Sequence, residues 1–245
     1  MTNVLALETS GPVCSVCLLH DGNRFEITEH VERRHNELLL GMVDDVCCKA
    51  SFSTPAEREQ IDVIAFGCGP GSFTGVRIAA AATQALALAW DAGVIPVSSS
   101  QALARAAQRS LEVSTLASVA GLITSIRSRQ SLHYLGCYAL AATGLNLQLD
   151  DALIDAYPGI GWPDDERWIG VGDRPLWWPA DAPFEEIEPA TAYDVGLIAL
   201  SGRLDRRDAA AAIPRYVAGD TPWSKDKKKN KEKIGRKTGP PVTRN

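Results

Sequence analysis

The chain has 245 residues, of which 45% are hydrophobic and 22% charged, a composition typical of a globular protein with a sizeable core and unlike that of a disordered or fibrous chain. Its net charge of −5 is unevenly distributed. Nine Lys and Arg against two acidic residues give residues 225–245 a charge of +7, which leaves −12 for residues 1–224. We therefore expect one large or two small acidic domains followed by a basic tail.

The sequence contains no pattern typical of secretion or membrane insertion. The opening MTNVLALETS lacks the basic start and the long apolar stretch of a signal peptide. The longest uncharged apolar run, residues 78–90, is too short to span a bilayer. We expect a soluble, cytoplasmic protein.

The first hundred residues alternate between patterns typical of strands and of helices. Three strand-like runs come first, and Asp21-Gly22-Asn23 between the second and third is a strong hairpin turn. A helix, a short apolar strand, a glycine-rich loop, an Ala-rich helix and a fifth strand follow. The predicted strands are 3–8, 13–19, 24–30, 62–66 and 94–99, and the predicted helices are 34–49 and 73–91.

The second half of the chain has a similar but weaker pattern. Four strand-like runs precede one helical run, and prolines and tryptophans mark the loops between them. The predicted strands are 116–124, 132–140, 145–153 and 167–173, and the predicted helix is 191–204.

The order β-β-β-α-β-α-β of the first half predicts a mixed sheet covered by helices. It matches the ribonuclease-H-like unit of actin, sugar kinases and chaperone ATPases. We predict an α/β protein of two ribonuclease-H-like domains with mixed sheets, in the actin-like ATPase superfamily. The expected limits are 1–104 for the first domain, 105–223 for the second, degenerate domain and 224–245 for a basic disordered tail.

The six cysteines fit a reduced interior better than a metal site. Cys14 and Cys17 form a Cys-x-x-Cys pair, but they lie in a strand-like run, where residues three apart point to opposite faces. No second pair completes a zinc site. Buried free thiols are therefore favoured over a zinc or redox pair. The other four also lie in apolar surroundings: Cys47, Cys48, Cys68 and Cys137.

The glycine-rich loop GCGPGSFTG, residues 67–75, leads directly into the Ala-rich helix. A glycine-rich loop before a helix N-terminus is a common phosphate-binding arrangement. No Gly-Lys-Ser/Thr follows, however, so the lysine and hydroxyl of a nucleotide-binding P-loop are missing. The alternative is a tight strand-to-helix turn, with Ser72 or Thr74 as the helix N-cap.

Four motifs together resemble the bacterial TsaB (YeaZ) family. They are GPGSFTGVRI at residues 69–78, VLALETSGPVCSVCLL at 4–19, ERRHNELLLGMVDDV at 32–46 and PRYVAGDTPWSK at 214–225. The resemblance is specific over about the first hundred residues and in the closing segment, and weaker between them. It implies an actin-like fold and a part in making threonylcarbamoyladenosine next to the anticodon of tRNA.

The resemblance also implies a partner. In that family the protein forms a heterodimer with its catalytic paralogue TsaD, and an ATPase subunit, TsaE, completes the assembly. The helices at about 34–49 and 73–91 make the contact, and the alanines of the second helix let another helix approach closely. The residues predicted to bind the partner are Arg34, His35, Leu38, Leu39, Met42, Ser72, Phe73, Thr74, Val76, Arg77, Ala80 and Ala85. Such a face would also pair with itself in the free protein as a homodimer.

The sequence gives reason to doubt catalysis in this chain. The catalytic paralogues carry a His-x-x-x-His pair after their glycine loop and helix, whereas residues 97–104 read VSSSQALA. Glu8 ends the first predicted strand, but few glycines follow it. We therefore predict a scaffold subunit without catalytic, metal or cofactor-binding residues. Two enzyme alternatives are a zinc-type peptidase and an ATP-dependent small-molecule kinase.

Two features remain outside this pattern. Arg127 stands where the family has Asp, and Ser131 where it has Gly, which puts any contact made there in doubt. The lysine run of the tail is either a salt-sensitive contact to tRNA or a solubilising appendage. We expect the protein to contact tRNA only indirectly or through this tail, and we expect no membrane contact.

Overall fold

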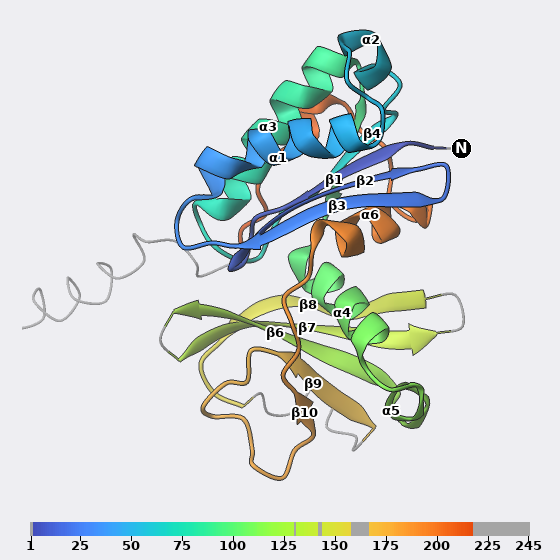
Figure 1. The fold of residues 1–245 in the computed structure, drawn as a ribbon. Coiled ribbons are helices and arrows are strands. Elements are labelled where there is room, and N and C mark those ends of the chain that lie inside the picture. Colours follow the sequence, from blue (N-terminus) through green and yellow to red (C-terminus); the bar gives the residue numbers. More distant parts are fainter. Residues whose placement is uncertain (1, 130, 142–143, 158–166, 218–245) are drawn as a thin grey trace, which may run out of the picture.

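The computed structural model describes residues 2–129, 131–141, 144–157 and 167–217. It contains two five-stranded sheets, one above the other in Figure 1, with strand orders β3-β2-β1-β4-β5 and β10-β9-β6-β7-β8. The first sheet joins β1 (Val4–Glu8), β2 (Val13–His20), β3 (Asn23–His30), β4 (Val63–Gly67) and β5 (Gly93–Val97). The second joins β6 (Gly121–Arg129), β7 (Leu132–Ala141), β8 (Gly144–Ile154), β9 (Trp168–Gly172) and β10 (Phe184–Glu185).

Both sheets mix antiparallel and parallel pairs in the same order. In the first sheet β1 pairs antiparallel with β2 and parallel with β4. In the second sheet β6 likewise pairs antiparallel with β7 and parallel with β9. Asp21 and Gly22 have φ of 48° and 77°, so the turn between β2 and β3 takes the left-handed backbone of a tight hairpin. The predicted fold of two ribonuclease-H-like domains with mixed sheets is confirmed.

Helices cover both faces of the first sheet. α1 (His35–Lys49) and α3 (Gly75–Trp90) lie side by side on one face, and the short α2 (Pro55–Arg58) follows α1 (Figure 1). α6 (Ala192–Leu200) lies on the opposite face. Because β2 is buried on both sides, Cys14 packs in the α1/α3 core and Cys17 in the α6 core. The prediction that the two thiols point to opposite faces is therefore confirmed.

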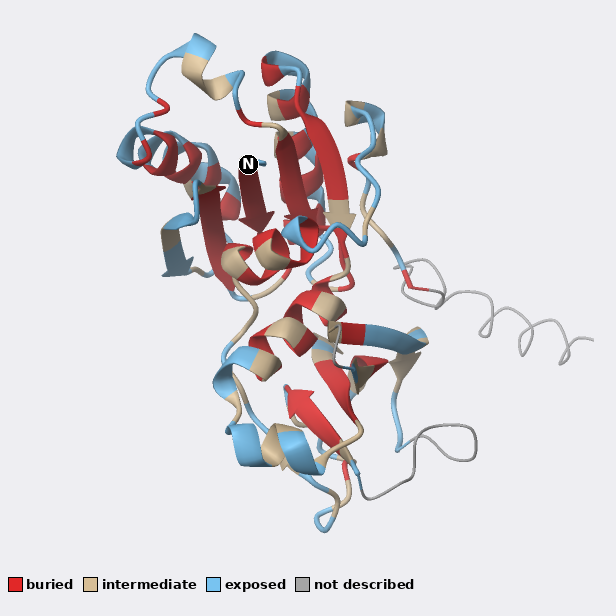
Figure 2. Ribbon diagram, turned by 90° about the vertical axis from the view of Figure 1, so that its right-hand side faces the viewer, coloured by how far each residue is buried: buried red, intermediate tan, exposed pale blue. Residues whose placement is uncertain are grey.

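The centre of the molecule is built from two helices far apart in sequence. α4 (Ser99–Ser110) packs against the second sheet, with the short α5 (Val113–Ser118) after it, and α4 also contacts α6. Figure 2 shows that the central strands are buried while the outer sides of the helices are exposed. The last described segment, which includes the 3-10 turn η1 (Ala209–Ala211), returns to the first sheet, where Arg207 bridges Val94.

Several sequence predictions need correction. The predicted strand 116–124 begins only at Gly121, because residues 113–118 form α5. The helix α4 was not predicted, although its buried residues recur at helical spacing. Cys48 is exposed, unlike the other five cysteines, which are buried, and all six are free. The domain limits 1–104 and 105–223 stay a prediction, and the predicted tail 224–245 lies outside the described residues.

None of the described helices is both long and apolar enough to cross a membrane.

Candidate functional site

The glycine-rich loop packs tightly against the turn that follows β1. The backbone N–H of Ser72 donates to the carbonyl oxygen of Ser10 at 2.7 Å. The Thr9 hydroxyl donates to the carbonyl oxygen of Gly75 at 2.8 Å. These two bonds join the start of α3 to the end of β1, so the loop is held by the chain's own backbone.

The glycines of the loop permit this close approach. A Cβ at Gly75 would overlap the carbonyl oxygen of Thr9, and one at Gly71 would overlap that of Ser10. Gly71 also has a φ of 158°, outside the usual range of other residues. Thr74 is the N-cap of α3 without a side-chain bond, while the Ser72 hydroxyl accepts from the Gly75 N–H at 3.2 Å. The tight-turn interpretation of the loop therefore has a direct steric basis.

Glu8 ends β1 with its carboxylate almost wholly buried, at 2% exposure. Its Oε1 accepts from the Ser10 N–H at 2.6 Å, whereas Oε2 has no hydrogen-bond partner among the described residues. Burial raises the pKa of Glu8 above its ordinary value of 4.5, and hydrogen bonds from Ser10 only partly oppose this. A carboxyl in these surroundings is therefore harder to ionise than one in water.

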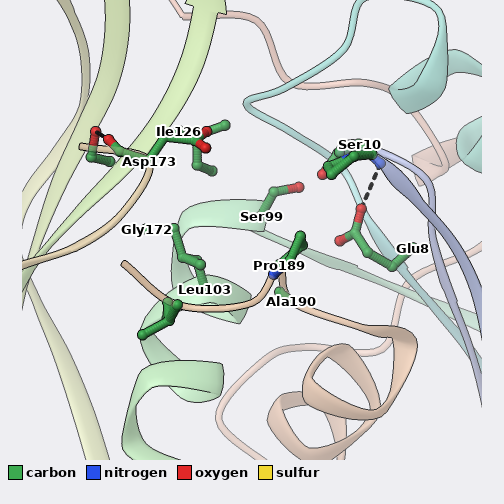
Figure 3. Close-up of a pocket in the computed structure, with 13 residues that line it drawn as sticks. Glu8, Ser10, Ser99, Leu103, Ile126, Gly172, Asp173, Pro189 and Ala190 are labelled. Atoms are coloured by element: carbon green, nitrogen blue, oxygen red, sulfur yellow. Dashed lines mark hydrogen bonds between the residues drawn. The ribbon is translucent and has the colours of Figure 1, made fainter. Parts of the chain in front are cut away.

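The pocket beside Glu8 lies between the two sheets and is small. Figure 3 shows Glu8, Ser10 and Ser99 on one side of it, with Ile126 and Asp173 across from them. Its volume is about 80 Å³, well below the roughly 300 Å³ at which ligand pockets usually begin. This part of the cleft alone is too small for a nucleotide.

A larger hollow opens at the mouth of the same cleft. It has a volume of about 630 Å³ and lies between the glycine loop and the end of β6. Ser72, Phe73 and Thr74 line one side and Arg127 and Arg129 the other. The backbone N–H of Arg127 donates to Asp173 at 2.8 Å. The structure thus brings three of the predicted partner-binding residues close to the position where the sequence departs from the family pattern.

The twelve predicted partner-binding residues divide between the core and the surface. Five are buried: His35, Leu39, Met42, Val76 and Ala80. Leu38 is half-buried. Six are exposed: Arg34, Ser72, Phe73, Thr74, Arg77 and Ala85. The buried residues pack α1 and α3 on the sheet, and the exposed ones are accessible from solvent.

His35 fixes the start of α1. Its ring is buried, and Nε2 lies 3.2 Å from the carbonyl oxygen of Gly11. Leu39, one helical turn after His35 on the same side of α1, packs in the core. Among residues 2–129, 131–141, 144–157 and 167–217, no three His, Cys, Asp or Glu side chains are grouped closely enough to hold a metal ion.

An aromatic cluster stands on the surface at the start of α3. The Arg77 guanidinium lies 3.3 Å above the centre of the Phe73 ring and 5.4 Å from that of Tyr216. The two rings are 5.9 Å apart, within the range of attractive aromatic pairs. Tyr216 was not among the predicted site residues, although it belongs to the PRYV motif at 214–217.

The largest exposed apolar side chains on α1 and α3 were also missed. Leu88 is 73% exposed and Leu40 58%. On α3 the exposed residues recur at helical spacing, so they form one stripe along the helix. We call the following set the helix face: Leu40, Gly41, Arg77, Ala81, Ala85 and Leu88. An apolar stripe of this kind on neighbouring helices is typical of a protein-binding surface.

Comparison with known proteins gives consistent similarities. Residues 27–155 match the sequence profile of a family described as "TsaD: tRNA N6-adenosine threonylcarbamoyltransferase". The "tRNA threonylcarbamoyladenosine biosynthesis protein TsaB" of Haemophilus influenzae is 43% identical over 104 residues, which are 42% of this chain and 42% of that protein. The Escherichia coli protein of the same name is 38% identical over 106 residues, or 43% and 44% of the two chains. These matches span less than half the length of either curated relative.

Solved structures match over a much larger part of the chain. "YeaZ from Pseudomonas aeruginosa" is 30% identical, with a TM-score of 0.71, over 89% of this chain and 100% of that one. A second structure, described as "an uncharacterized protein with similarity to peptidase YEAZ from Pseudomonas aeruginosa", has a TM-score of 0.72 at 30% identity and the same coverage.

Proposed function

Since the chain belongs to the TsaB/YeaZ family, we propose that it takes part in the biosynthesis of threonylcarbamoyladenosine in tRNA as a non-catalytic subunit. It binds TsaD and holds that subunit in its active form. Transfer of the threonylcarbamoyl group from its adenylate to adenosine takes place in TsaD, and the ATPase TsaE completes the assembly. The complex works in the cytoplasm, and the free chain pairs with itself through the same surface.

The observation that carries this proposal is the helix face. Leu88 and Leu40 expose apolar side chains, and the small exposed residues of the same set, Gly41, Ala81 and Ala85, allow another helix to come close. The buried residues of α1 and α3 fill the core beneath, so the face is presented on a rigid support. The match of residues 27–155 to the TsaD profile further supports pairing with a protein of the same fold.

The geometry of the cleft supports a non-catalytic role. The carboxyl of Glu8 is almost wholly buried, and burial raises its pKa, which disfavours the carboxylate form that binds Mg²⁺. At the start of α4, where the catalytic paralogues have histidines, Ser99, Ser100 and Leu103 are buried. These side chains cannot replace imidazole as metal ligands.

Capture of TsaD by the tagged, full-length chain tests the proposal. Replacing Leu88 by Arg places a long charged side chain on the helix face, and we expect TsaD capture to fall at least about tenfold. Leu176→Arg is the matched control, because Leu176 is 99% exposed and lies outside α1 and α3. It should capture TsaD like the wild type.

Two outcomes would overturn the proposal. If the wild type captures no TsaD, or if both variants capture it equally, the helix face is not the binding surface. If the purified chain instead retains stoichiometric zinc or binds Mg²⁺-ATP tightly in calorimetry, the peptidase or kinase alternative takes its place. Thermal melts of both variants should match that of the wild type, since neither leucine packs in the core.

A further inference from the structure

A second groove runs between the two sheets, beside β8 and the chain segment that follows α6. Its wider part has a volume of about 800 Å³ and its narrower part about 410 Å³. The two parts share Gln101, Leu145 and Arg203, so they form one continuous hollow. None of its residues is among the twelve predicted partner-binding residues. We call it the arginine groove.

Four arginines line the arginine groove: Arg105, Arg203, Arg207 and Arg215. No Asp or Glu lines either part among the described residues. Asp205 and Asp208 are exposed on the same segment but do not line the hollow. This concentration of positive charge contrasts with the charge of −12 on residues 1–224.

The arginines differ in whether other side chains of the protein neutralise their charge. Arg215 pairs with Asp150 and with Asp151, the latter at 3.2 Å, so carboxylates balance its charge. Arg105 donates only a long bond of 3.4 Å to the neutral amide of Gln108. The exposed guanidinium of Arg207 makes no hydrogen bond or ion pair with the described part of the chain. Arg105 and Arg207 are therefore the cations available to a ligand.

We propose that the arginine groove binds the phosphate backbone of tRNA. Guanidinium groups recognise phosphate oxygens through paired N–H donors, and an elongated groove with spaced arginines suits a chain of phosphates better than one small anion. Tyr138, the aromatic residue of the lining, is buried, so no exposed ring offers a platform for base stacking. The contact is therefore independent of sequence and sensitive to salt.

The continuation of the chain supports this occupant. The last described residue, Val217, follows Arg215 by two positions, and the lysine run of residues 225–237 begins eight positions later. Basic residues of groove and tail are thus close along the sequence. The inference rests on the proposed function in one respect: the proposed function identifies tRNA as the RNA that binds.

Binding of a fluorescent, unmodified tRNA to the full-length chain at several salt concentrations tests the inference. The double variant Arg105→Gln/Arg207→Gln removes the two available cations and breaks no ion pair. We expect weaker binding at low salt and a slope of log K against log salt that is less steep by about two units, one for each arginine. The tail is present in every protein compared, so its contribution cancels.

The double variant Arg33→Gln/Lys49→Gln is the matched control. It removes the same net charge at two exposed residues that line neither part of the groove. It should keep the wild-type slope. Equal slopes for the groove variant and the control, or for the groove variant and the wild type, would overturn the inference.

Two further measurements separate the remaining possibilities. If pyrophosphate or ATP binds with dependence on Arg105 and Arg207 while tRNA does not, the groove is a small-anion site and the inference is wrong. TsaD capture by the groove variant should equal that of the wild type. If the groove variant keeps the wild-type salt dependence of tRNA binding and captures TsaD normally, only the inference about the groove is wrong. If the wild type captures no TsaD, the proposed function is wrong.

Discussion

Arg109 and Asp194 form a two-point ion pair that ties α4 to α6. Nε and Nη2 of Arg109 donate to Oδ1 and Oδ2 of Asp194, both at 3.0 Å. Asp194 is fully buried and also accepts from the Thr191 N–H at 3.0 Å, which caps α6. One carboxylate therefore holds the first turn of α6 and its contact with the helix that covers the second sheet.

Removing the arginine should cost more than removing the carboxylate. Arg109→Gln leaves Asp194 buried without its counter-ion, and we expect a loss of about 3–5 kcal/mol in the free energy of unfolding. Asp194→Asn keeps one oxygen for the cap and leaves a partly exposed guanidinium that water can solvate, so its loss should be smaller. Urea unfolding of both variants measures the difference, and an equal or reversed order would contradict this account.

Gly75 should not tolerate even the smallest side chain. The Cβ of Gly75→Ala would meet the Thr9 carbonyl oxygen, and we expect a loss of about 1–3 kcal/mol from the forced shift of backbone. Gly41→Ala is the control, because nothing lies within 4 Å of its Cβ in the middle of α1. That change should instead raise stability by about 0.5–1 kcal/mol. Thermal melts of the two variants should therefore move in opposite directions.

Glu8 predicts a pH dependence of stability. Its pKa in the folded chain is raised above 4.5 by burial, so the folded state holds the proton more firmly than the unfolded state. Its contribution to stability is therefore complete below the unfolded pKa and is lost as the pH rises through the folded pKa. Glu8→Gln should be less sensitive over this window and at least as stable as the wild type near pH 7. Parallel curves for the two proteins in urea unfolding against pH would contradict the prediction.

Cys48 should be the thiol that reacts in the native protein. The other five cysteines are buried, and burial raises the pKa of Cys17 and Cys137 to about 12. A maleimide reagent should therefore label one thiol in the native chain and six in denaturant. Cys48→Ser should remove the native labelling and leave five sites in denaturant. Native labelling of that variant would show that a buried cysteine becomes accessible.

The first sheet and its helices could be predicted from sequence because their signals are local. Alternating apolar residues, the Asp21-Gly22 turn and the spacing of α1 all act over a few residues, and the observed bounds of α1 and α3 differ from the predicted ones by one or two positions. The exposure of Leu88 could not be predicted in this way. α3 is apolar nearly all round, so its sequence does not reveal which side the sheet covers. The burial of Glu8 and the ion pair between Arg109 and Asp194 likewise depend on residues far apart in the chain.

The position of α6 also constrains how the protein is made. α6 supplies Ala192, Val195 and Ile198 to the face of the first sheet that carries Ala6 and Cys17. A nascent chain leaving the ribosome therefore carries this sheet with one apolar face uncovered until synthesis has passed residue 200. During that interval the uncovered apolar face makes the first half prone to aggregation. A fragment that ends before α6 should be insoluble when expressed alone, even though it contains every strand of the first sheet.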